Sequence, residues 1–184
     1  MNTKKIKIIA LFGPAGAGKD LLQEVMVKNH GLHGIISHTT RPMRDNEVDG
    51  VAYHFVTDDE FEKMVEEDKF LETADFNHWY YGTSIDSLSE DEVNIGVFNI
   101  AGIKSLLTDS RIEVHPVYLC VPDKLRLLRQ LKRETNPNCL EICRRFLTDN
   151  EDFKNVDFEY DLLMNDSSIY KAEEALVECL TEID

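Results

Sequence analysis

The chain has 184 residues, with 35 acidic and 20 basic side chains and a formal net charge of −15. A chain below ~250 residues usually forms one compact domain, and so acidic a surface disfavours nucleic acid and anionic membranes as partners. The composition, 42% hydrophobic and 30% charged, is that of a folded globular protein. We therefore expect one domain that binds neither nucleic acid nor a membrane.

Membrane spans and structural metal sites are not expected either. The longest apolar run near the N-terminus, residues 8–12, is far shorter than the ~18 residues that cross a bilayer. The four cysteines show no CxxC spacing and have no histidine placed to complete a zinc site. These are Cys120, Cys139, Cys143 and Cys179. We expect reduced thiols and a cytoplasmic location.

The first predicted elements are a strand, a turn and a helix. Residues 6–12 are apolar enough for a buried strand, and the apolar residues 21, 22, 25 and 26 follow at helical spacing. Residues 34–38 are predicted to form one further strand. Residues 39–50 are polar and contain a proline, which predicts a surface loop.

A helix is predicted to begin after Thr57. Thr57 and Glu60 have the spacing of a capping box, and Phe61, Met64 and Val65 are expected on the inner face of the helix. The later elements alternate between the two types. Strands are predicted at 70–76, 79–81, 93–98, 112–121 and 160–164, and helices at 103–107, at 123–148 with a break at 135–138, and at 168–183. This alternation indicates an α/β fold with a mostly parallel sheet.

A glycine-rich motif lies between the first strand and the first helix. Its sequence matches GxxxxGK in the strand–loop–helix context of a P-loop. Its backbone N–H groups, the helix N-terminus and the Lys19 ammonium would cradle the β- and γ-phosphates of a nucleotide. The motif comprises Gly13, Pro14, Ala15, Gly16, Ala17, Gly18, Lys19 and Asp20.

Asp20 departs from the usual motif, in which a hydroxyl residue follows the lysine and binds Mg²⁺. Two interpretations are open. The carboxylate could contribute to the metal site, since Mg²⁺ prefers oxygen ligands. Alternatively, Asp20 complements the dipole of the helix that it begins.

Residues 39–55 read TTRPMRDNEVDGVAYHF and agree without a mismatch with T-[ST]-R-x2-[KR]-x2-[DE]-x2-G-x2-Y-x-[FY]. That pattern is the guanylate kinase signature, and the chain resembles this family over nearly its whole length. The likeness continues through Phe70-Leu-Glu72, Tyr80-Tyr-Gly-Thr83, Arg129, Arg133, Arg144-Arg145 and Asn165-Asp166. The resemblance implies a P-loop NTPase-like parallel sheet flanked by helices, with a small mixed β/α insertion that binds the nucleoside monophosphate (NMP) and a helical lid.

The resemblance also implies the acceptor site. Guanidinium forks suit a phosphate monoester, and the phosphate of GMP is assigned to Arg41, Arg44, Tyr53 and Tyr81. The guanine is assigned to Ser37, Glu72 and Thr83. The Glu72 carboxylate can accept hydrogen bonds from the N1–H and the exocyclic amine of guanine, whereas adenine has a lone pair at N1.

One family pattern is altered. Where the family usually has Asp-x-Asp, this chain has Val97-Phe98-Asn99, so Asn99 is placed in the GMP site without a charge. This departure leaves the substrate and the metal arrangement open.

The donor side carries a local basic segment. Residues 122–148 contain seven basic and three acidic residues, which indicates either a polyphosphate nearby or a solvated helix with i,i+4 ion pairs. By resemblance this segment is the lid, with Arg129 and Arg133 at the donor phosphates and Arg145 at the transferred group. Arg144 takes that role if the register differs by one residue. Asn165 is assigned to ATP.

The resemblance implies one domain over residues 1–184, with a core of 1–37, 91–128 and 149–184, an NMP-binding region of 38–90 and a lid of about 129–148. The expected activity is phosphoryl transfer from ATP, with Mg²⁺, to GMP or dGMP. Its catalytic residues would be Lys19, Arg41, Arg129, Arg133 and Arg145. Two alternatives remain: a kinase for another (deoxy)nucleoside monophosphate, and a non-catalytic interaction module. The oligomeric state is left undecided.

Overall fold

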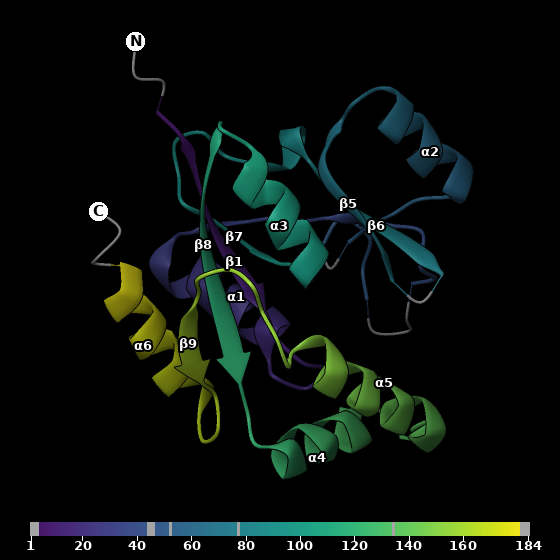
Figure 1. Ribbon diagram of the computed structural model, residues 1–184, viewed down its shortest axis with the longest axis vertical. Helices are drawn as coiled ribbons and strands as arrows, with labels where there is room; N and C mark the ends of the chain where they lie inside the picture. Colours follow the sequence, from purple (N-terminus) through teal and green to yellow (C-terminus); the bar gives the residue numbers. More distant parts are fainter. Residues whose placement is uncertain (1–3, 44–46, 52, 77, 134, 181–184) are drawn as a thin grey trace. The chain divides into compact units, whose positions relative to one another are not determined.

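The computed structural model describes residues 4–43, 47–51, 53–76, 78–133 and 135–180, and Figure 1 shows the arrangement of the elements. Their bounds in chain order are β1 (Ile6–Phe12), α1 (Lys19–His30), β2 (His33–Gly34), β3 (His38–Thr39), β4 (His54–Phe55), α2 (Asp58–Glu66), β5 (Phe70–Phe76), β6 (Trp79–Ser84), η1 (Ile85–Ser87), β7 (Asn94–Val97), α3 (Ile100–Thr108), β8 (Ile112–Cys120), α4 (Asp123–Arg133), α5 (Cys139–Asp152), β9 (Asp161–Met164) and α6 (Ile169–Leu180).

The strands form two sheets. A five-stranded parallel sheet has the order β2-β7-β1-β8-β9, and a four-stranded mixed sheet has the order β4-β3-β6-β5. In the mixed sheet β6 is antiparallel to both β3 and β5, while β3 and β4 are parallel. The α/β fold class predicted from the sequence is confirmed. Within the described ranges, no helix combines the length and apolar character that a membrane span requires.

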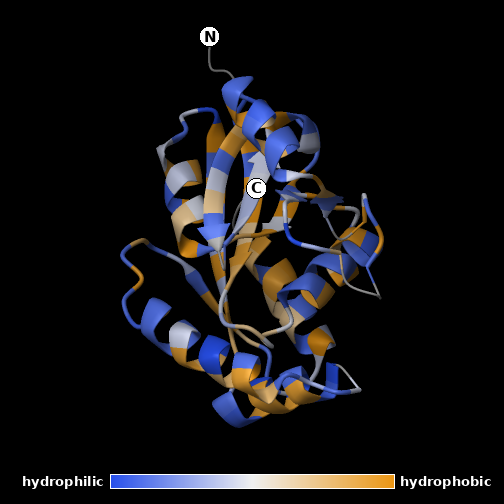
Figure 2. Cartoon of the chain, turned by 90° about the vertical axis from the view of Figure 1, so that its right-hand side faces the viewer, coloured by the Kyte–Doolittle hydropathy of each residue, from blue (hydrophilic) through white to orange (hydrophobic). Residues whose placement is uncertain are grey.

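The chain divides into two compact units, one of residues 1–9 and 32–114 and one of residues 10–31 and 115–184. The second unit is built on the C-terminal part of β1. Leu22 and Met26 of α1 are fully buried because residues four positions apart lie on the same helix face. Helix α1 packs against α6, which buries Ala172 and Leu176. Figure 2 shows that helices of the chain carry hydrophobic residues on one side and hydrophilic residues on another.

The first unit contains the mixed sheet together with β2, β7, α2 and α3. Its α2 helix begins as predicted, with a complete capping box between Thr57 and Glu60. Phe61 is buried and stacks on the ring of Phe70, with ring centroids 4.6 Å apart. The expectation that Val65 also faces inward is wrong, because half of this residue is exposed. A helix of nine residues buries only a narrow stripe against the sheet.

Two further expectations are corrected. Residues 34–38 do not form one strand, because Gly34 pairs with β7 of the parallel sheet and His38 pairs with β6 of the mixed sheet. The segment leaves one sheet and enters the other. Residues 39–50 are not a surface loop throughout, since Thr39 lies in β3 with no exposure and Arg41 is only 6% exposed.

Candidate active site

The phosphate loop lies in the second unit, between β1 and α1. Gly16 and Gly18 adopt positive φ angles of 83° and 92°, which favour glycine. A side chain at either position would also meet neighbours, because a Cβ would lie 2.6 Å from the carbonyl oxygen of Arg126 or 2.7 Å from Nδ2 of Asn165, respectively. These contacts explain why both positions are glycine.

Lys19 is the first residue of α1 and its ammonium group turns back onto the loop. Its Nζ donates to the carbonyl oxygens of Gly13 and Pro14, at 2.7 and 3.1 Å. Burial lowers the pKa of Lys19 below its usual value of 10.5, while the carboxylates of Asp20 and Asp149 act in the opposite direction. An ammonium group held inside a loop of N–H donors is the arrangement that binds a polyphosphate.

Asp20 lies in the first turn of α1 and is exposed. Among the described residues, no group of three or more His, Cys, Asp or Glu side chains could hold a metal ion. A nucleotide-bound Mg²⁺ does not require such a group, since phosphates and water supply most of its ligands. The single carboxylate of Asp20 is compatible with that chemistry.

The basic residues of α4 and α5 occupy two kinds of position. Arg129 of α4 contacts the phosphate loop, with Nη1 3.3 Å from the carbonyl oxygen of Gly16 and Nη2 3.0 Å from that of Asn165. Arg145 and Arg144 of α5 both donate to Glu141, with Nε to carboxylate distances of 2.6 and 2.8 Å. Of these two neighbours, Arg145 is less exposed, at 28% against 48%. Arg133 ends α4 and is exposed, yet its charge contributes to lowering the pKa of Lys19.

Asn165 lies directly after β9 and is 3% exposed. Its Nδ2 donates to the carbonyl oxygen of Ala17 at 2.7 Å. Its Oδ1 atom is buried and has no hydrogen-bond partner among the residues that the structure describes. Because a buried acceptor without a donor is costly, this atom is suited to accept a hydrogen bond from a ligand.

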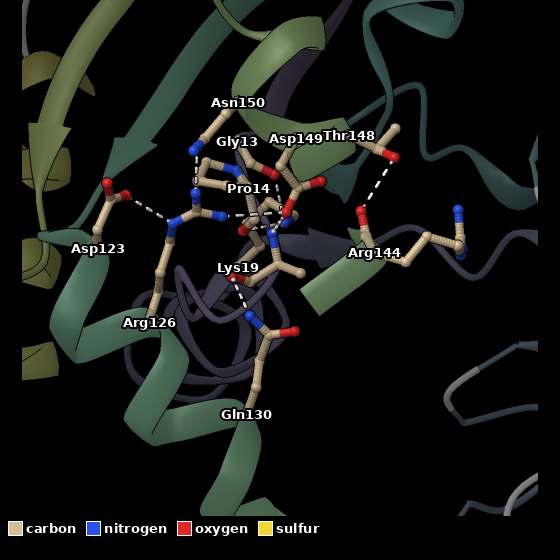
Figure 3. A network of polar contacts seen from close by, with 11 residues as sticks. Gly13, Pro14, Lys19, Asp123, Arg126, Gln130, Arg144, Thr148, Asp149 and Asn150 are labelled. Atoms are coloured by element: carbon tan, nitrogen blue, oxygen red, sulfur yellow. Dashed lines mark hydrogen bonds and ion pairs between the residues drawn. The ribbon is translucent and has the colours of Figure 1, made fainter. Parts of the chain in front are cut away.

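A network that the sequence did not predict joins α4, α5 and the loop (Figure 3). Arg126 of α4 is 1% exposed, and its guanidinium contacts the side chains of Asp123, Asp149 and Asn150. It also lies over the ring of Phe146, 3.7 Å from the centroid. Asp149 in turn accepts a hydrogen bond from the backbone N–H of Ala15, and Gln130 donates to the carbonyl oxygen of the same residue. No local sequence signal could have revealed the link, because Ala15 and Asp149 are 134 positions apart.

The residues assigned to guanine lie together in the first unit. Glu72 of β5 is paired with Thr83 of β6, and the Thr83 hydroxyl lies 3.1 Å from that of Ser37. Glu72 is 8% exposed and Thr83 is fully buried. Burial raises the pKa of Glu72 above its usual value of 4.5, and hydrogen bonds from Thr83 oppose the shift. The sheet therefore brings a carboxylate and two hydroxyl groups to one place.

The start of α3 borders this group. Asn99 is the N-cap of α3, and its Oδ1 accepts from the N–H of Gly102 at 2.7 Å. A Cβ at Gly102 would lie 2.7 Å from Oε2 of Glu72, so the carboxylate approaches the helix N-terminus at a residue that has no side chain. A helix N-terminus favours the ionised carboxylate. The importance of Gly102 was not predicted.

The residues assigned to the acceptor phosphate are brought together in part. The Arg41 guanidinium lies 5.2 Å from the ring centroid of Tyr53, whose ring lies 5.9 Å from that of Tyr81. Glu47 accepts hydrogen bonds from both terminal nitrogens of Arg41. Burial lowers the pKa of Arg41, but Glu47 and the two tyrosines raise it by more, so the pKa lies above its usual value. Arg44, which was expected beside Arg41, lies outside the described residues.

The phosphate loop and the residues assigned to GMP occur in a chain that matches one family of proteins. A family model described as guanylate kinase matches residues 5–183. The chain belongs to the guanylate kinase family. A guanylate kinase from Schizosaccharomyces pombe is 38% identical over 152 residues, which cover 78% of this chain and 73% of the relative. One from Sulfurimonas denitrificans is 34% identical over 181 residues, 96% of this chain and 87% of the relative.

Solved structures agree with the guanylate kinase fold. The crystal structure of guanylate kinase from Anaplasma phagocytophilum superposes with a TM-score of 0.70 at 17% identity and covers 98% of this chain and 86% of that one. A gluconokinase from Sinorhizobium meliloti reaches 0.55 at 12% identity, with 100% of this chain and 95% of that one covered. Likeness at these identities concerns the fold alone. The family predicted from residues 39–55 is thus confirmed by the family model and the relatives.

Proposed function

We propose that this protein transfers the γ-phosphoryl group of ATP to GMP or dGMP and releases ADP with GDP or dGDP. Membership of the guanylate kinase family supports this reaction. In the step, a phosphate oxygen of the acceptor forms a bond to the γ-phosphorus. The bond from that phosphorus to the bridging oxygen breaks, and its electron pair leaves with ADP. The acceptor phosphate needs no general base, since its second pKa of ~6 leaves it mostly ionised at pH 7.

The observation that carries the choice of base is the buried Glu72 carboxylate beside Thr83 and Ser37. A carboxylate can accept from two neighbouring donors, which guanine presents at N1 and at its exocyclic amine. The N-terminus of α3 beside Glu72 favours the ionised form that accepts both. Adenine presents an acceptor at N1, so it would leave the carboxylate without one of its donors.

The acceptor phosphate would be held by Arg41 and Arg44, with the hydroxyl groups of Tyr53 and Tyr81 as neutral donors. A guanidinium group offers two parallel N–H donors to a phosphate. The bidentate contact between Arg41 and Glu47 supports this role, because it orients the fork toward two anionic oxygens. The GMP phosphate would replace Glu47 at the two terminal nitrogens of Arg41, or would bind them together with Glu47.

ATP would be held by the phosphate loop. Backbone N–H groups and Lys19 would bind its phosphates, with Arg129 beside the loop. The buried Oδ1 of Asn165, which has no partner within the described part of the chain, would accept a hydrogen bond from the nucleotide. Arg133 and Arg145 would add positive charge as the transferred group becomes metaphosphate-like. Catalysis would therefore consist of positioning and charge neutralisation.

Mg²⁺ is part of this proposal, with Asp20 as the protein carboxylate that would hold it beside the nucleotide phosphates. The ion supplies charge neutralisation between the phosphate groups. Residues 38–90 are proposed as the NMP-binding region and residues 129–148 as the lid. A cytoplasmic location fits a substrate pair of metabolic nucleotides and four cysteines in the thiol form.

The test is to incubate the protein with ATP and each common ribo- and deoxyribonucleoside monophosphate, and to identify every product. We expect GMP and dGMP to be phosphorylated and AMP to be rejected by a factor on the order of 10⁴. Glu72→Gln should erode this preference, and Glu66→Gln, which removes an exposed carboxylate of α2, should not. Comparable turnover of AMP and GMP would contradict the guanine assignment, and transfer to no acceptor would favour an interaction module.

A further inference from the structure

The carboxylate of Asp149 is bound by the phosphate loop. Its Oδ2 atom accepts a hydrogen bond from the backbone N–H of Ala15 at 2.8 Å, and lies 3.3 Å from Nη1 of Arg126. The side chain of Asp149 is only 13% exposed. Figure 3 shows it pointing from α5 into the group formed by Arg126 and the loop. An anion is therefore already present where the loop is built to receive one.

The ammonium group at the end of the loop is also engaged internally. The Lys19 ammonium donates to two carbonyl oxygens of its own loop, and the negative charge of Asp149 acts on it across the network. A bound polyphosphate needs these donors to turn toward its oxygens. Phosphate and the Asp149 carboxylate thus require the same positive environment.

The carboxylate occupies this place at a cost. Burial raises the pKa of Asp149 above its usual value of 3.8, although Ala15, Lys19 and Arg126 all favour the charged form. Desolvation of an ionised carboxylate is unfavourable. A movement toward water would recover that hydration, so a stronger anion can replace Asp149 in the loop.

We propose that Asp149 is an internal anion that occupies the phosphate loop until the polyphosphate of ATP displaces it. The proposal relies on the proposed function for the identity of ATP alone. Asp149 thereby lowers the affinity for ATP and couples its binding to α5. Arg126 retains the contacts to Asp123, Asn150 and Phe146, so its buried charge stays compensated when Asp149 moves.

Displacement of Asp149 has a consequence for the lid. Arg145 precedes Asp149 by four residues on the same helix, and residues at this spacing lie on the same helix face. The face of α5 that presents Asp149 to the loop therefore also carries Arg145. When the carboxylate leaves the loop, the polyphosphate that replaces it becomes the partner of this basic side chain.

The test measures binding of inorganic tripolyphosphate by calorimetry, with EDTA present, so that neither a nucleobase nor a metal contributes. Asp149→Asn and Asp149→Ala should each tighten binding by about tenfold or more, since the internal charge-assisted hydrogen bond no longer competes. Glu151→Gln is the matched control, because it removes one negative charge from an exposed position of α5, and it should change the affinity less than about threefold. Unchanged or weaker binding by both Asp149 variants would overturn the proposal.

A second measurement uses the unaltered protein and does not depend on the folding of any variant. The ¹³C resonance of the Asp149 carboxyl group should shift on addition of tripolyphosphate, because the tripolyphosphate takes the backbone N–H of Ala15 that donates to Asp149. A resonance that remains fixed at saturation would overturn the proposal. Neither measurement involves GMP or turnover, so an absence of kinase activity would contradict the proposed function and leave this result standing.

Discussion

Arg41 and Glu47 form a bidentate ion pair, in which Nη1 and Nη2 lie 2.7 and 2.8 Å from the two carboxylate oxygens. The pair is nearly buried, with side-chain exposures of 6% for Arg41 and 13% for Glu47. A guanidinium group held in this way keeps a fixed orientation, which is the property that recognition of a phosphate monoester requires.

Replacement of Arg41 tests its part in binding the acceptor. Arg41→Ala should raise the KM for GMP and lower kcat/KM. The loss of transition-state stabilisation should be about 2 to 5 kcal/mol, the range for loss of a buried charged partner. ATP affinity should barely change. Steady-state kinetics with each nucleotide varied in turn would measure both effects.

The matched control is Arg111→Ala, because Arg111 also pairs bidentately with a carboxylate, that of Asp109, through Nε to Oδ1 and Nη2 to Oδ2, but is 61% exposed. It should leave GMP binding unchanged. An equal loss of affinity for ATP and GMP in Arg41→Ala would indicate a general loss of structure and contradict the assignment. Arg44→Ala is expected to behave like Arg41→Ala, on the strength of the sequence alone.

Glu72 should make the stability of the ligand-free protein depend on pH. Its pKa is raised in the folded state, mainly by burial, because the buried site favours the protonated carboxyl group. The stability that comes with the protonated form is fully present below about pH 4.5. It is lost as the pH rises through the pKa of the folded state. Above that pH the folded protein must hold an ionised carboxylate in a buried place, which costs free energy of folding. Glu72→Gln removes this dependence.

Thermal melting at a series of pH values would check this expectation. The Tm of Glu72→Gln, relative to that of the unaltered protein, should increase as the pH is raised from mildly acidic to neutral. Glu66→Gln removes an exposed carboxylate and should show no such trend. If the Glu72 variant and the unaltered protein melted in parallel across the range, the carboxylate would not carry the expected desolvation cost.

Gly102 is expected to control the position of the Glu72 carboxylate, which we propose binds guanine. A Cβ at this position would lie 2.7 Å from Oε2 of Glu72, so Gly102→Ala must displace the carboxylate. The KM for GMP should rise between about tenfold and a hundredfold, as for small misplacements of a binding group. The new alanine should at the same time favour α3 by about 0.5 to 1 kcal/mol.

Kinetics and melting together therefore separate the two effects of Gly102→Ala. Ser105→Ala changes an exposed residue of the same helix and should affect neither GMP binding nor ATP binding. A Gly102→Ala protein with unchanged KM for GMP would show that Glu72 does not need its present position.

Asp20 is tested by titration with Mg²⁺. If its carboxylate takes part in holding the ion, Asp20→Ala should raise the Mg²⁺ concentration for half-maximal rate and lower kcat. Asp20→Ser should recover part of the loss because it restores a hydroxyl ligand. Glu24→Ala, an exposed acidic residue later in α1, is the control.

The alternative for Asp20 predicts a different result. A residue that only complements the helix dipole contributes about 0.3 to 1 kcal/mol to stability. Asp20→Ala would then lower the Tm slightly and leave kcat and the Mg²⁺ titration as they were, which would contradict the metal role.

The elements with strong local signals were predictable. The strand over residues 6–12 has the predicted bounds, and the capping box of Thr57 and Glu60 forms as predicted. Both depend on interactions between residues close in the chain. For the same reason the GxxxxGK motif and the signature in residues 39–55 are enough to indicate the family.

The sequence by itself thus determined the family and predicted the phosphate loop and the residues of both proposed nucleotide sites, because these depend on short motifs. Only the tertiary structure decided that residues 34–38 are divided between two sheets and that Glu72 lies against Gly102. It alone placed Asp149 on the N–H of Ala15. Such contacts join residues far apart in the chain, and their formation depends on how strands and helices pack, which no local pattern of residues encodes.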